Sequence, residues 1–340
     1  MNTKTVYYEI TNRCNFNCTT CYNRSGLNKI TKEISLDTIK ESMENFRTLG
    51  ANRFLFSGGE PSLHSEFESL LDLISEYKDY SFGFVTNGSS RNKKFIELLK
   101  THDNITLQIS LDGSCEEENS KTRGAGNFEK VVNFVRETYN PHRQTRLKMV
   151  ISKNNYDDIE DFYGLAISLG CIPEFAFIFR SGNGVESWDQ KGLSPQEKLK
   201  ALTMIDALNK KFGIDAFLPR SSLSCPFITG NDKMSLCVKV DGKIQPCQTF
   251  YTDRFSLGNI YNFDKDGIIK NSLMIVDLAK KRASLDFGCS RCVINEICQR
   301  GCMAEALTIS GDPLGNDQSC MFRKLEFLNF NIKNTLGKTK

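Results

Sequence analysis

The first 184 residues alternate between short apolar runs and amphipathic segments, and this alternation predicts the fold. Most of the apolar runs end in a polar or glycine-rich turn, which is typical of buried strands. These strands with their turns are predicted over residues 5–10, 53–61, 81–88, 105–113, 146–155 and 173–184. Helices are predicted between them, over residues 35–50, 67–77, 93–100, 128–139 and 159–169. Strand-then-helix steps of this kind predict an α/β fold with a parallel sheet, and their number fits a partial (β/α)6 TIM-like barrel better than a complete eightfold one.

Beyond residue 192 the alternation stops. The remaining predicted elements are an amphipathic helix over 194–212, a β-hairpin over 235–247, a cysteine-rich segment over 286–320 and a closing helix over 321–336. The hairpin is predicted from the Asp241-Gly242 turn between two apolar runs. We therefore expect four regions: a barrel over 1–192, a bridging helix over 193–216, a small cysteine-rich domain with a hairpin and short helices over 217–325, and a C-terminal helix and tail over 326–340.

Composition and charge exclude several classes of protein. Apolar residues make up 39% of the chain and charged residues 25%, as in ordinary folded proteins. The net charge of +3, from basic residues spread along the chain, does not indicate a nucleic-acid partner. The N-terminus lacks an apolar signal segment, and no run reaches the roughly 18 apolar residues of a membrane span, so we expect a cytoplasmic protein without a membrane partner. Thirteen cysteines in such a protein indicate metal binding or catalysis rather than disulfides.

Three cysteines, Cys14, Cys18 and Cys21, directly follow the first predicted strand in the spacing C-x3-C-x2-C. A structural zinc site takes four ligands, and no nearby His or Cys completes such a site. In a [4Fe–4S] cluster three thiolates leave one iron open to a ligand that is not protein. Because ligands bind at the carboxyl ends of the strands in parallel α/β sheets, the polar turns there are the candidate binding residues.

This arrangement resembles the radical S-adenosylmethionine (SAM) superfamily. The resemblance implies that the open iron binds the amino and carboxylate groups of SAM. It also implies that reductive cleavage of SAM gives a 5′-deoxyadenosyl radical, which abstracts a hydrogen atom from the substrate. The turn Ser57-Gly58-Gly59-Glu60-Pro61 is similar to the GGEP turn of that family. We expect its glycines to admit the methionine ammonium and Glu60 to supply negative charge near it.

The resemblance implies further SAM contacts at the other strand ends: Thr86, Asn87, Ser110, Arg123, Val150 and Ile151. Val150 and Ile151 are expected beside the adenine. The sequence departs from the family at one point, since Thr20 stands where an aromatic residue usually precedes the third cysteine. Tyr22 follows that cysteine instead, so the residue that stacks on the adenine stays open.

The C-terminal cysteines resemble a SPASM domain, which carries two auxiliary iron–sulfur clusters. The motif is Cys289-x2-Cys292-x5-Cys298-x3-Cys302, with Cys320 behind it and Cys247 after Gly242-x4. The segment 247–260 is also similar to anaerobic sulfatase-maturating enzymes. The resemblance implies one [4Fe–4S] cluster on Cys289, Cys292, Cys298 and Cys320, and a second on Cys225, Cys237, Cys247 and Cys302. Two interpretations of Cys237 stay open, a fourth ligand or a strand residue that leaves one iron free, and two zinc sites are the alternative from spacing alone.

These resemblances imply oxidative modification of a peptide or protein substrate. The leading hypothesis is a maturase that installs an intramolecular crosslink in a ribosomally made peptide (a RiPP maturase). The alternatives are an anaerobic sulfatase-maturating enzyme, which forms formylglycine, and a dehydrogenase or epimerase of a small molecule. In the small-molecule case Cys115 or Cys171 would donate hydrogen to the substrate radical. No catalytic residue is nominated for any of these reactions.

The same hypotheses predict partners. An external reductant such as flavodoxin or ferredoxin is expected. Because the first strand begins near residue 5, either a separate leader-binding protein or the barrel itself is expected to recognise the leader of the peptide. The edge of the sheet would allow a peptide to add as a strand. Arg180, which ends the sixth predicted strand, is a candidate for binding a substrate carboxylate.

Overall fold

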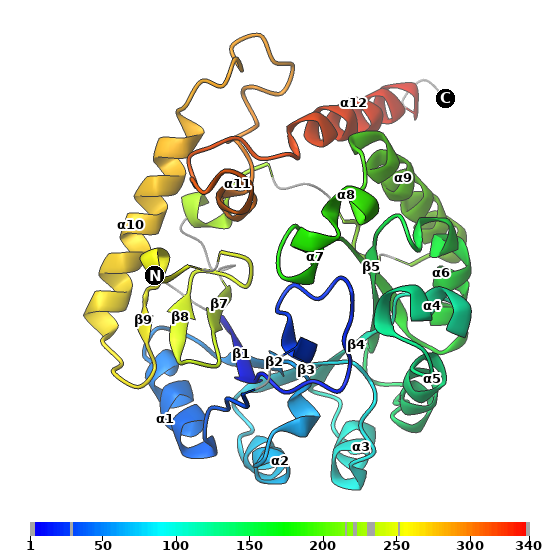
Figure 1. The fold of residues 1–340 in the computed structure, drawn as a ribbon, viewed down its shortest axis with the longest axis vertical. Helices are drawn as coiled ribbons and strands as arrows, with labels where there is room; N and C mark the ends of the chain where they lie inside the picture. Colours follow the sequence, from blue (N-terminus) through cyan, green and yellow to red (C-terminus); the bar gives the residue numbers. More distant parts are fainter. Residues whose placement is uncertain are drawn as a thin grey trace.

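The structure is a computed structural model that describes residues 4–27, 30–214, 216–219, 223–229, 235–250 and 252–337. Six parallel strands form a curved sheet with helices on its outer face (Figure 1). They are β1 Thr5–Thr11, β2 Arg53–Gly58, β3 Ser81–Thr86, β4 Ile105–Ser110, β5 Arg146–Ile151 and β6 Ile172–Phe177. The predicted partial (β/α)6 barrel is confirmed, with neighbouring strands paired in sequence order from β1 to β6. The outer limits of the expected regions, residues 1 and 340, and Tyr251 within the segment 247–260 lie outside the described residues.

The barrel helices form where the sequence places apolar residues on one face and a cap at the start. They are α1 Leu36–Arg47, α2 Phe67–Glu76, α3 Lys93–Thr101, α4 Glu116–Arg123, α5 Phe128–Glu137 and α6 Ile159–Ser168. Ser35 caps α1 by accepting from the N–H of Thr38, and Asn92 caps α3 in the same way. The core lies between these helices and the sheet, where Tyr8, Phe54 and Phe134 are fully buried.

The helix α4 was not predicted, because its sequence EEENSKTR has no apolar face. Its buried residues are Asn119, Thr122 and Arg123, which contact the strand-end turns instead of the core. Two four-residue helices, α7 Asn183–Glu186 and α8 Trp188–Lys191, follow β6. The helix α9, Pro195–Phe212, begins with a capping box between Ser194 and Glu197, in agreement with the predicted helix over 194–212.

The predicted hairpin forms, but it also extends the barrel sheet. Its strands are β7 Ser235–Val238 and β8 Lys243–Gln245, and β9 Gly258–Asn259 pairs with β8. The strand β7 lies parallel to β1, with Tyr7 opposite Cys237, so one sheet of nine strands runs in the order β6-β5-β4-β3-β2-β1-β7-β8-β9. The sheet therefore continues past the expected boundary between barrel and cysteine-rich domain.

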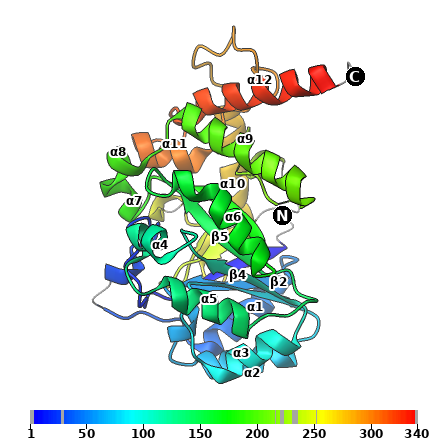
Figure 2. The same ribbon diagram turned by 90° about the vertical axis from the view of Figure 1, so that its right-hand side faces the viewer.

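Three helices complete the C-terminal part: α10 Lys265–Ala283, α11 Met303–Ser310 and α12 Cys320–Gly337. Figure 2 shows α12 and the loop after α10 at one end of the molecule and α2 and α3 at the other. Short 3-10 helices lie at Ser25–Leu27, Pro61–Leu63, Tyr156–Asp158, Pro226–Thr229 and Asp253–Phe255. Within the described residues, no helix has the length and apolar character that crossing a membrane requires.

Candidate SAM and iron–sulfur sites

The loop that carries Cys14, Cys18 and Cys21 follows β1 at the carboxyl end of the sheet. Two other strand-end regions hold it in place, since Thr19 N donates to Thr122 O at 2.9 Å and Asn183 N donates to Cys21 O at 2.8 Å. The thiols lie within electrostatic range of one another, and burial raises the pKa of Cys14 and raises that of Cys18 to about 12. Binding of a metal cluster must therefore displace protons from this site.

The turn Ser57-Gly58-Gly59-Glu60-Pro61 packs directly against the cysteine loop. Gly59 N donates to Thr11 O at 2.8 Å, and Glu60 N donates to Arg13 O at 2.7 Å. A Cβ on Gly59 would lie 1.9 Å from Arg13 O, and one on Gly58 would lie 2.2 Å from Thr11 O. The two glycines are thus explained by the close approach of the cysteine loop, a reason that the sequence did not reveal.

Glu60 is fully buried and its carboxylate is saturated with protein donors. Oε1 accepts from Ser62 N, Ser62 Oγ and Thr86 Oγ1, and Oε2 accepts from Asn87 N at 2.7 Å. Burial raises the pKa of Glu60, and these hydrogen bonds oppose that shift. The carboxylate of Glu60 fixes the turn after β3 through Thr86 and Asn87, and its role near a ligand ammonium stays a prediction.

Arg123 reaches the cysteine loop through a buried ion pair. Its Nε lies 2.9 Å from Asp112 Oδ2, and its Nη1 lies 3.9 Å from Cys18 Sγ. Asp112 is fully buried, and its Oδ1 accepts from Val150 N at 2.8 Å. Its backbone N–H donates to Asn119 Oδ1 at 3.0 Å. Asp112, which orients the cation toward a thiol, lies in the predicted turn that ends at residue 113 but was not among the residues predicted to bind SAM. An aspartate immediately after an apolar strand was the available signal.

The other expected SAM contacts divide into two groups. Asn87 Nδ2 donates to Asn15 Oδ1 at 2.9 Å and lies 4.0 Å from Cys14 Sγ, so it belongs to the site, and Ser110 is half-buried at the end of β4. Val150 is half-buried on β5, but Ile151 is fully buried in the core between sheet and helices. Successive strand residues point to opposite faces, so Val150 and Ile151 lie on different sides of β5, and their place beside the adenine stays a prediction.

The turn after β6 supports the cysteine loop from the opposite side. Gly182 has φ of +56°, and a Cβ there would lie 2.3 Å from Tyr22 O and 2.4 Å from Cys21 O. Asn183 Nδ2 donates to Cys18 O at 2.8 Å, and Ser181 Oγ donates to Tyr22 O at 3.2 Å. Gly182 and Asn183 were not nominated from the sequence, although the SGNG turn was visible.

Tyr22 turns toward β1 and β7. Its hydroxyl donates to Glu9 Oε1 at 3.3 Å, and Lys239 Nζ lies 5.7 Å from the centre of its ring. Lys239 Nζ also lies 2.5 Å from Glu9 Oε1, and both side chains are 5% exposed. This buried ion pair joins β1 to the strand end of β7. Tyr22 thus contacts residues of β1 and β7, whereas Val150, which is expected beside the adenine, lies on β5. Thr20 is buried.

Four of the C-terminal cysteines line one pocket of about 190 Å³: Cys289, Cys292, Cys298 and Cys320. Asp317, Arg282 and Arg323 surround it, and Arg323 lies 2.8 Å from Asp317 Oδ2. Arg282 donates to the carbonyls of Arg300 and Pro313 and so holds the cysteine loops against α10. The structure thus places the four cysteines that were expected to share one cluster around a single pocket.

The remaining cysteines gather around Cys247. Cys225, Cys237 and Cys302 each lie within electrostatic range of its sulfur. Burial raises the pKa of Cys225 to about 11 and that of Cys302 to about 12. Opposite Cys237 on the hairpin, the fully buried amide of Gln245 has no hydrogen-bond partner among the described residues. An unpartnered buried amide beside thiols fits a cofactor with hydrogen-bonding atoms, such as the sulfides of an iron–sulfur cluster.

The ligands of a single metal ion would have to lie closer together than these side chains do. In the described part of the chain, no three His, Cys, Asp or Glu side chains converge closely enough to hold one metal ion. The thiolates around a four-iron cluster each bind a different iron and stand farther apart than the ligands of one zinc ion.

Three other nominated residues lie in different places. Cys171 is buried before β6, at the end of the sheet opposite the cysteine loop. Cys115 is exposed at the start of α4. Arg180 follows β6, and its guanidinium lies 5.9 Å from the centre of the Trp188 ring. The position of Cys171 argues against a role as hydrogen donor.

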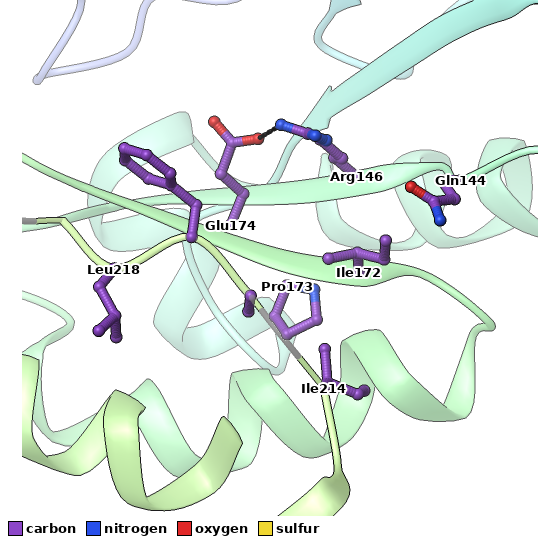
Figure 3. A pocket seen from close by; sticks show the side chains of 9 residues that line it. Gln144, Arg146, Ile172, Pro173, Glu174, Ile214 and Leu218 are labelled. Atoms are coloured by element: carbon purple, nitrogen blue, oxygen red, sulfur yellow. Dashed lines mark hydrogen bonds and ion pairs between the residues drawn. The ribbon is translucent and has the colours of Figure 1, made fainter. Parts of the chain in front are cut away.

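A second hollow lies at the amino ends of β5 and β6, and Figure 3 shows the side chains that line it. The cysteine loop follows the carboxyl end of β1, at the opposite end of the parallel strands. It has a volume of about 630 Å³, and Arg146 and Glu174 form an ion pair of 3.3 Å in its wall. The segment containing Ile214 and Leu218 forms its other side. In barrels of this kind the active site lies at the carboxyl ends of the strands, so this hollow at the amino ends is not part of the cofactor site.

Comparisons with known proteins agree with this geometry. Residues 8–166 match the radical SAM superfamily. The mycofactocin maturase MftC of Mycolicibacterium smegmatis is 26% identical over 325 residues, which cover 92% of this chain and 81% of that protein.

Two solved structures share the fold. SuiB of Streptococcus suis bound to S-adenosylmethionine has a TM-score of 0.72 and 15% identity, over 94% of this chain and 77% of that one. The structure of anSMEcpe with bound AdoMet has a TM-score of 0.76 and 20% identity, over 99% and 98% of the two chains. The cofactors that the domain brings are SAM and a [4Fe–4S] cluster. The chain thus carries a radical SAM domain over residues 8–166 and is a radical SAM enzyme.

Proposed function

We propose that this enzyme modifies a ribosomally made peptide, and that it installs an intramolecular crosslink. The observation that carries the proposal is the presence of three separate cysteine groups in one chain, on Cys14-Cys18-Cys21, around Cys247, and around the pocket of Cys289 and Cys320. A hydrogen abstraction needs only the first group. The other two support a net oxidation of the substrate, in which two hydrogens are lost.

The chain's own residues would divide the work as follows. Cys14, Cys18 and Cys21 hold the SAM-binding cluster, and Arg123 and Asn87 donate toward their sulfurs. Cys289, Cys292, Cys298 and Cys320 hold one auxiliary cluster, and Cys225, Cys237, Cys247 and Cys302 hold the other. When bound, SAM would supply the 5′-deoxyadenosyl radical after one electron from the first cluster, and an auxiliary cluster would accept one electron from the substrate radical. The peptide and the enclosing strand-end turns exclude water from the radical.

The relatives support a peptide substrate. MftC is named a maturase, a second relative, SkfB of Bacillus subtilis, is named a sporulation killing factor maturation protein, and SuiB has been solved with its precursor peptide SuiA. We infer the same substrate class here, with a one-electron reductant such as flavodoxin or ferredoxin and recognition of the leader by a separate protein or by the barrel. The structure of anSMEcpe with a peptide keeps sulfatase maturation as the second candidate.

The deciding experiment is anaerobic reconstitution with SAM, a reductant and candidate peptides, with the product read by mass spectrometry. A loss of two hydrogens within one peptide, with fragments that stay joined, is the expected result. A formylglycine product on a sulfatase-derived peptide would favour the second candidate. Failure to form 5′-deoxyadenosine under reducing conditions would overturn both.

A further inference from the structure

A pocket of about 250 Å³ lies at the carboxyl end of β6, and one of its lining residues is Cys302 of the group around Cys247. Its walls come from the end of β6, from α8, α9 and α11, and from the start of α12. Phe177, Phe322 and Trp188 make it largely aromatic. Three charged side chains, Lys198, Arg180 and Glu305, also line it.

Lys198 is the most unusual of these residues. It is only 8% exposed, and its Nζ lies 5.6 Å from the centre of the Phe177 ring and 5.9 Å from that of Phe322. No hydrogen bond or ion pair joins this ammonium to any residue that the structure describes. A buried cation without such a partner is costly, and cation–π contacts compensate for only part of the lost hydration. Burial accordingly lowers the pKa of Lys198, although Glu305 and Asp317 oppose the shift.

The charges around the pocket favour an anion. Arg180 contacts the face of Trp188 and, within the described ranges, forms no ion pair. Glu305 is already engaged, since its Oε1 accepts from Ser319 Oγ at 2.8 Å. The pocket therefore offers two cations with donors to spare against one carboxylate whose hydrogen bonding is partly satisfied.

The strand beside the pocket has a free edge. In the described sheet β6 is the last strand, and it pairs only with β5. Ile172 N and Ile178 N donate to β5, so even-numbered residues face that neighbour. Because a parallel ladder alternates, Phe175 and Phe177 direct their N–H and C=O groups to the open edge. Phe217, which is 66% exposed, lines both this pocket and the hollow at the other end of β6.

The pocket also lies between two cysteine groups. Arg180 immediately precedes Ser181 and Gly182, which contact the loop of Cys21. Cys302, of the group around Cys247, lines the pocket directly. A substrate held here would reach both the site of hydrogen abstraction and an exit for an electron.

We propose that this pocket binds a carboxylate of the substrate peptide, with the peptide added as a strand along the free edge of β6 and its acidic group at Lys198 and Arg180. The carboxylate is either the C-terminus of the peptide or an Asp or Glu side chain. That the ligand is a peptide rests on the proposed function. The pocket's preference for an aromatic or aliphatic neighbour of the carboxylate follows from Phe177, Phe322 and Trp188.

The test uses Trp188, which is the only tryptophan in the chain and lines the pocket. Three probes are titrated into the anaerobic holoenzyme, N-acetylphenylalanine, its amide, and the α-amide of N-acetylglutamate, with calorimetry for affinity and Trp188 emission for location. We expect at least one carboxylate to bind about tenfold more tightly than the neutral amide, and to change the emission, because a charge-assisted hydrogen bond is at stake. The better of the two carboxylates identifies a C-terminal or a side-chain source.

Lys198→Gln is expected to remove the preference for carboxylate, and Arg180→Gln to weaken it. The matched control is Lys200→Gln, an exposed lysine on the same helix, which should retain the preference. Equal binding of the carboxylates and the amide by the unmodified enzyme overturns the inference, even where Lys198→Gln does not fold. Formation of 5′-deoxyadenosine by the unmodified enzyme is scored separately, so a failed pocket and a failed proposed function are distinguishable.

Discussion

The carboxylate of Glu60 accepts a hydrogen bond from the backbone N–H of Asn87 at 2.7 Å, and this bond joins the turn after β2 to the turn after β3. Asn87 in turn donates to Asn15 in the cysteine loop. Three segments that are distant in sequence are thereby fixed around one buried carboxylate.

Replacement of Glu60 by Gln should loosen this junction. The amide nitrogen would face a donor where the carboxylate oxygen now accepts, so one buried N–H or hydroxyl loses its partner at a cost of about 1–3 kcal/mol. We expect lower stability in denaturant and weaker SAM binding, measured by equilibrium dialysis on the anaerobic holoenzyme. Glu76→Gln, at an exposed position at the end of α2, is the control. Equal SAM affinity in both variants would contradict this role.

Gly182→Ala should disturb the cysteine loop. The new Cβ would lie 2.3 Å from Tyr22 O, and the backbone has φ of +56°. Gly213 is the matched control, since it has φ of +65° but no atom within 4 Å of an added Cβ. Gly213→Ala should lower the free energy of unfolding by about 1–2 kcal/mol, the cost of a left-handed backbone for a residue with a Cβ. Gly182→Ala should in addition lose iron from the first cluster, and iron analysis that finds no difference between the two variants would refute the contact.

Asp112→Asn should destabilise the enzyme strongly. It leaves the buried guanidinium of Arg123 without its counter-charge, and breaking a buried pair in this way costs about 3–5 kcal/mol. The control is Glu118→Gln, which removes the Lys121 pair on the surface and should cost less than about 1 kcal/mol. Denaturant unfolding of both variants gives the comparison. Similar unfolding midpoints for the two variants would show that the buried pair of Asp112 and Arg123 stabilises the fold no more than the surface pair does.

Much of this architecture could be predicted from the sequence because the signals are local. The strands of the barrel, their polar turns and the cysteine spacings each depend on neighbouring residues. The pairing of β7 with β1 could not be predicted, because Tyr7 and Cys237 are far apart in the chain and their register is set by packing. The buried pair of Glu9 and Lys239 accompanies that register, but neither residue stands in a motif.

The helix α10 was not among the elements predicted from the sequence, and the reason is the irregular composition of its buried face. Its buried positions include Ile268, Ser272, Ile275, Ala279 and Arg282, which follow a helical period. Ser272 and Arg282 interrupt the apolar face, while Leu273 and Met274 are exposed. The buried arginine is tolerated because the carbonyls of Arg300 and Pro313 accept its hydrogen bonds, and that compensation exists only in the folded chain.

Cys237 decides how the cluster around Cys247 is completed, and an iron count tests it. Cys237 is fully buried and shares a hairpin face with the Gln245 amide, for which the described residues provide no hydrogen-bond partner; both observations support a ligand role. Three four-iron clusters require about twelve irons per chain, so Cys237→Ala should lower the content toward about eight and change the EPR spectrum of the reduced enzyme. Cys171→Ala removes another buried thiol, at the opposite end of the sheet, and should retain about twelve. Unchanged iron and EPR signals in Cys237→Ala would mean that the cluster has only three protein ligands and an open iron facing the barrel, and about four irons in the unmodified enzyme would remove both auxiliary clusters.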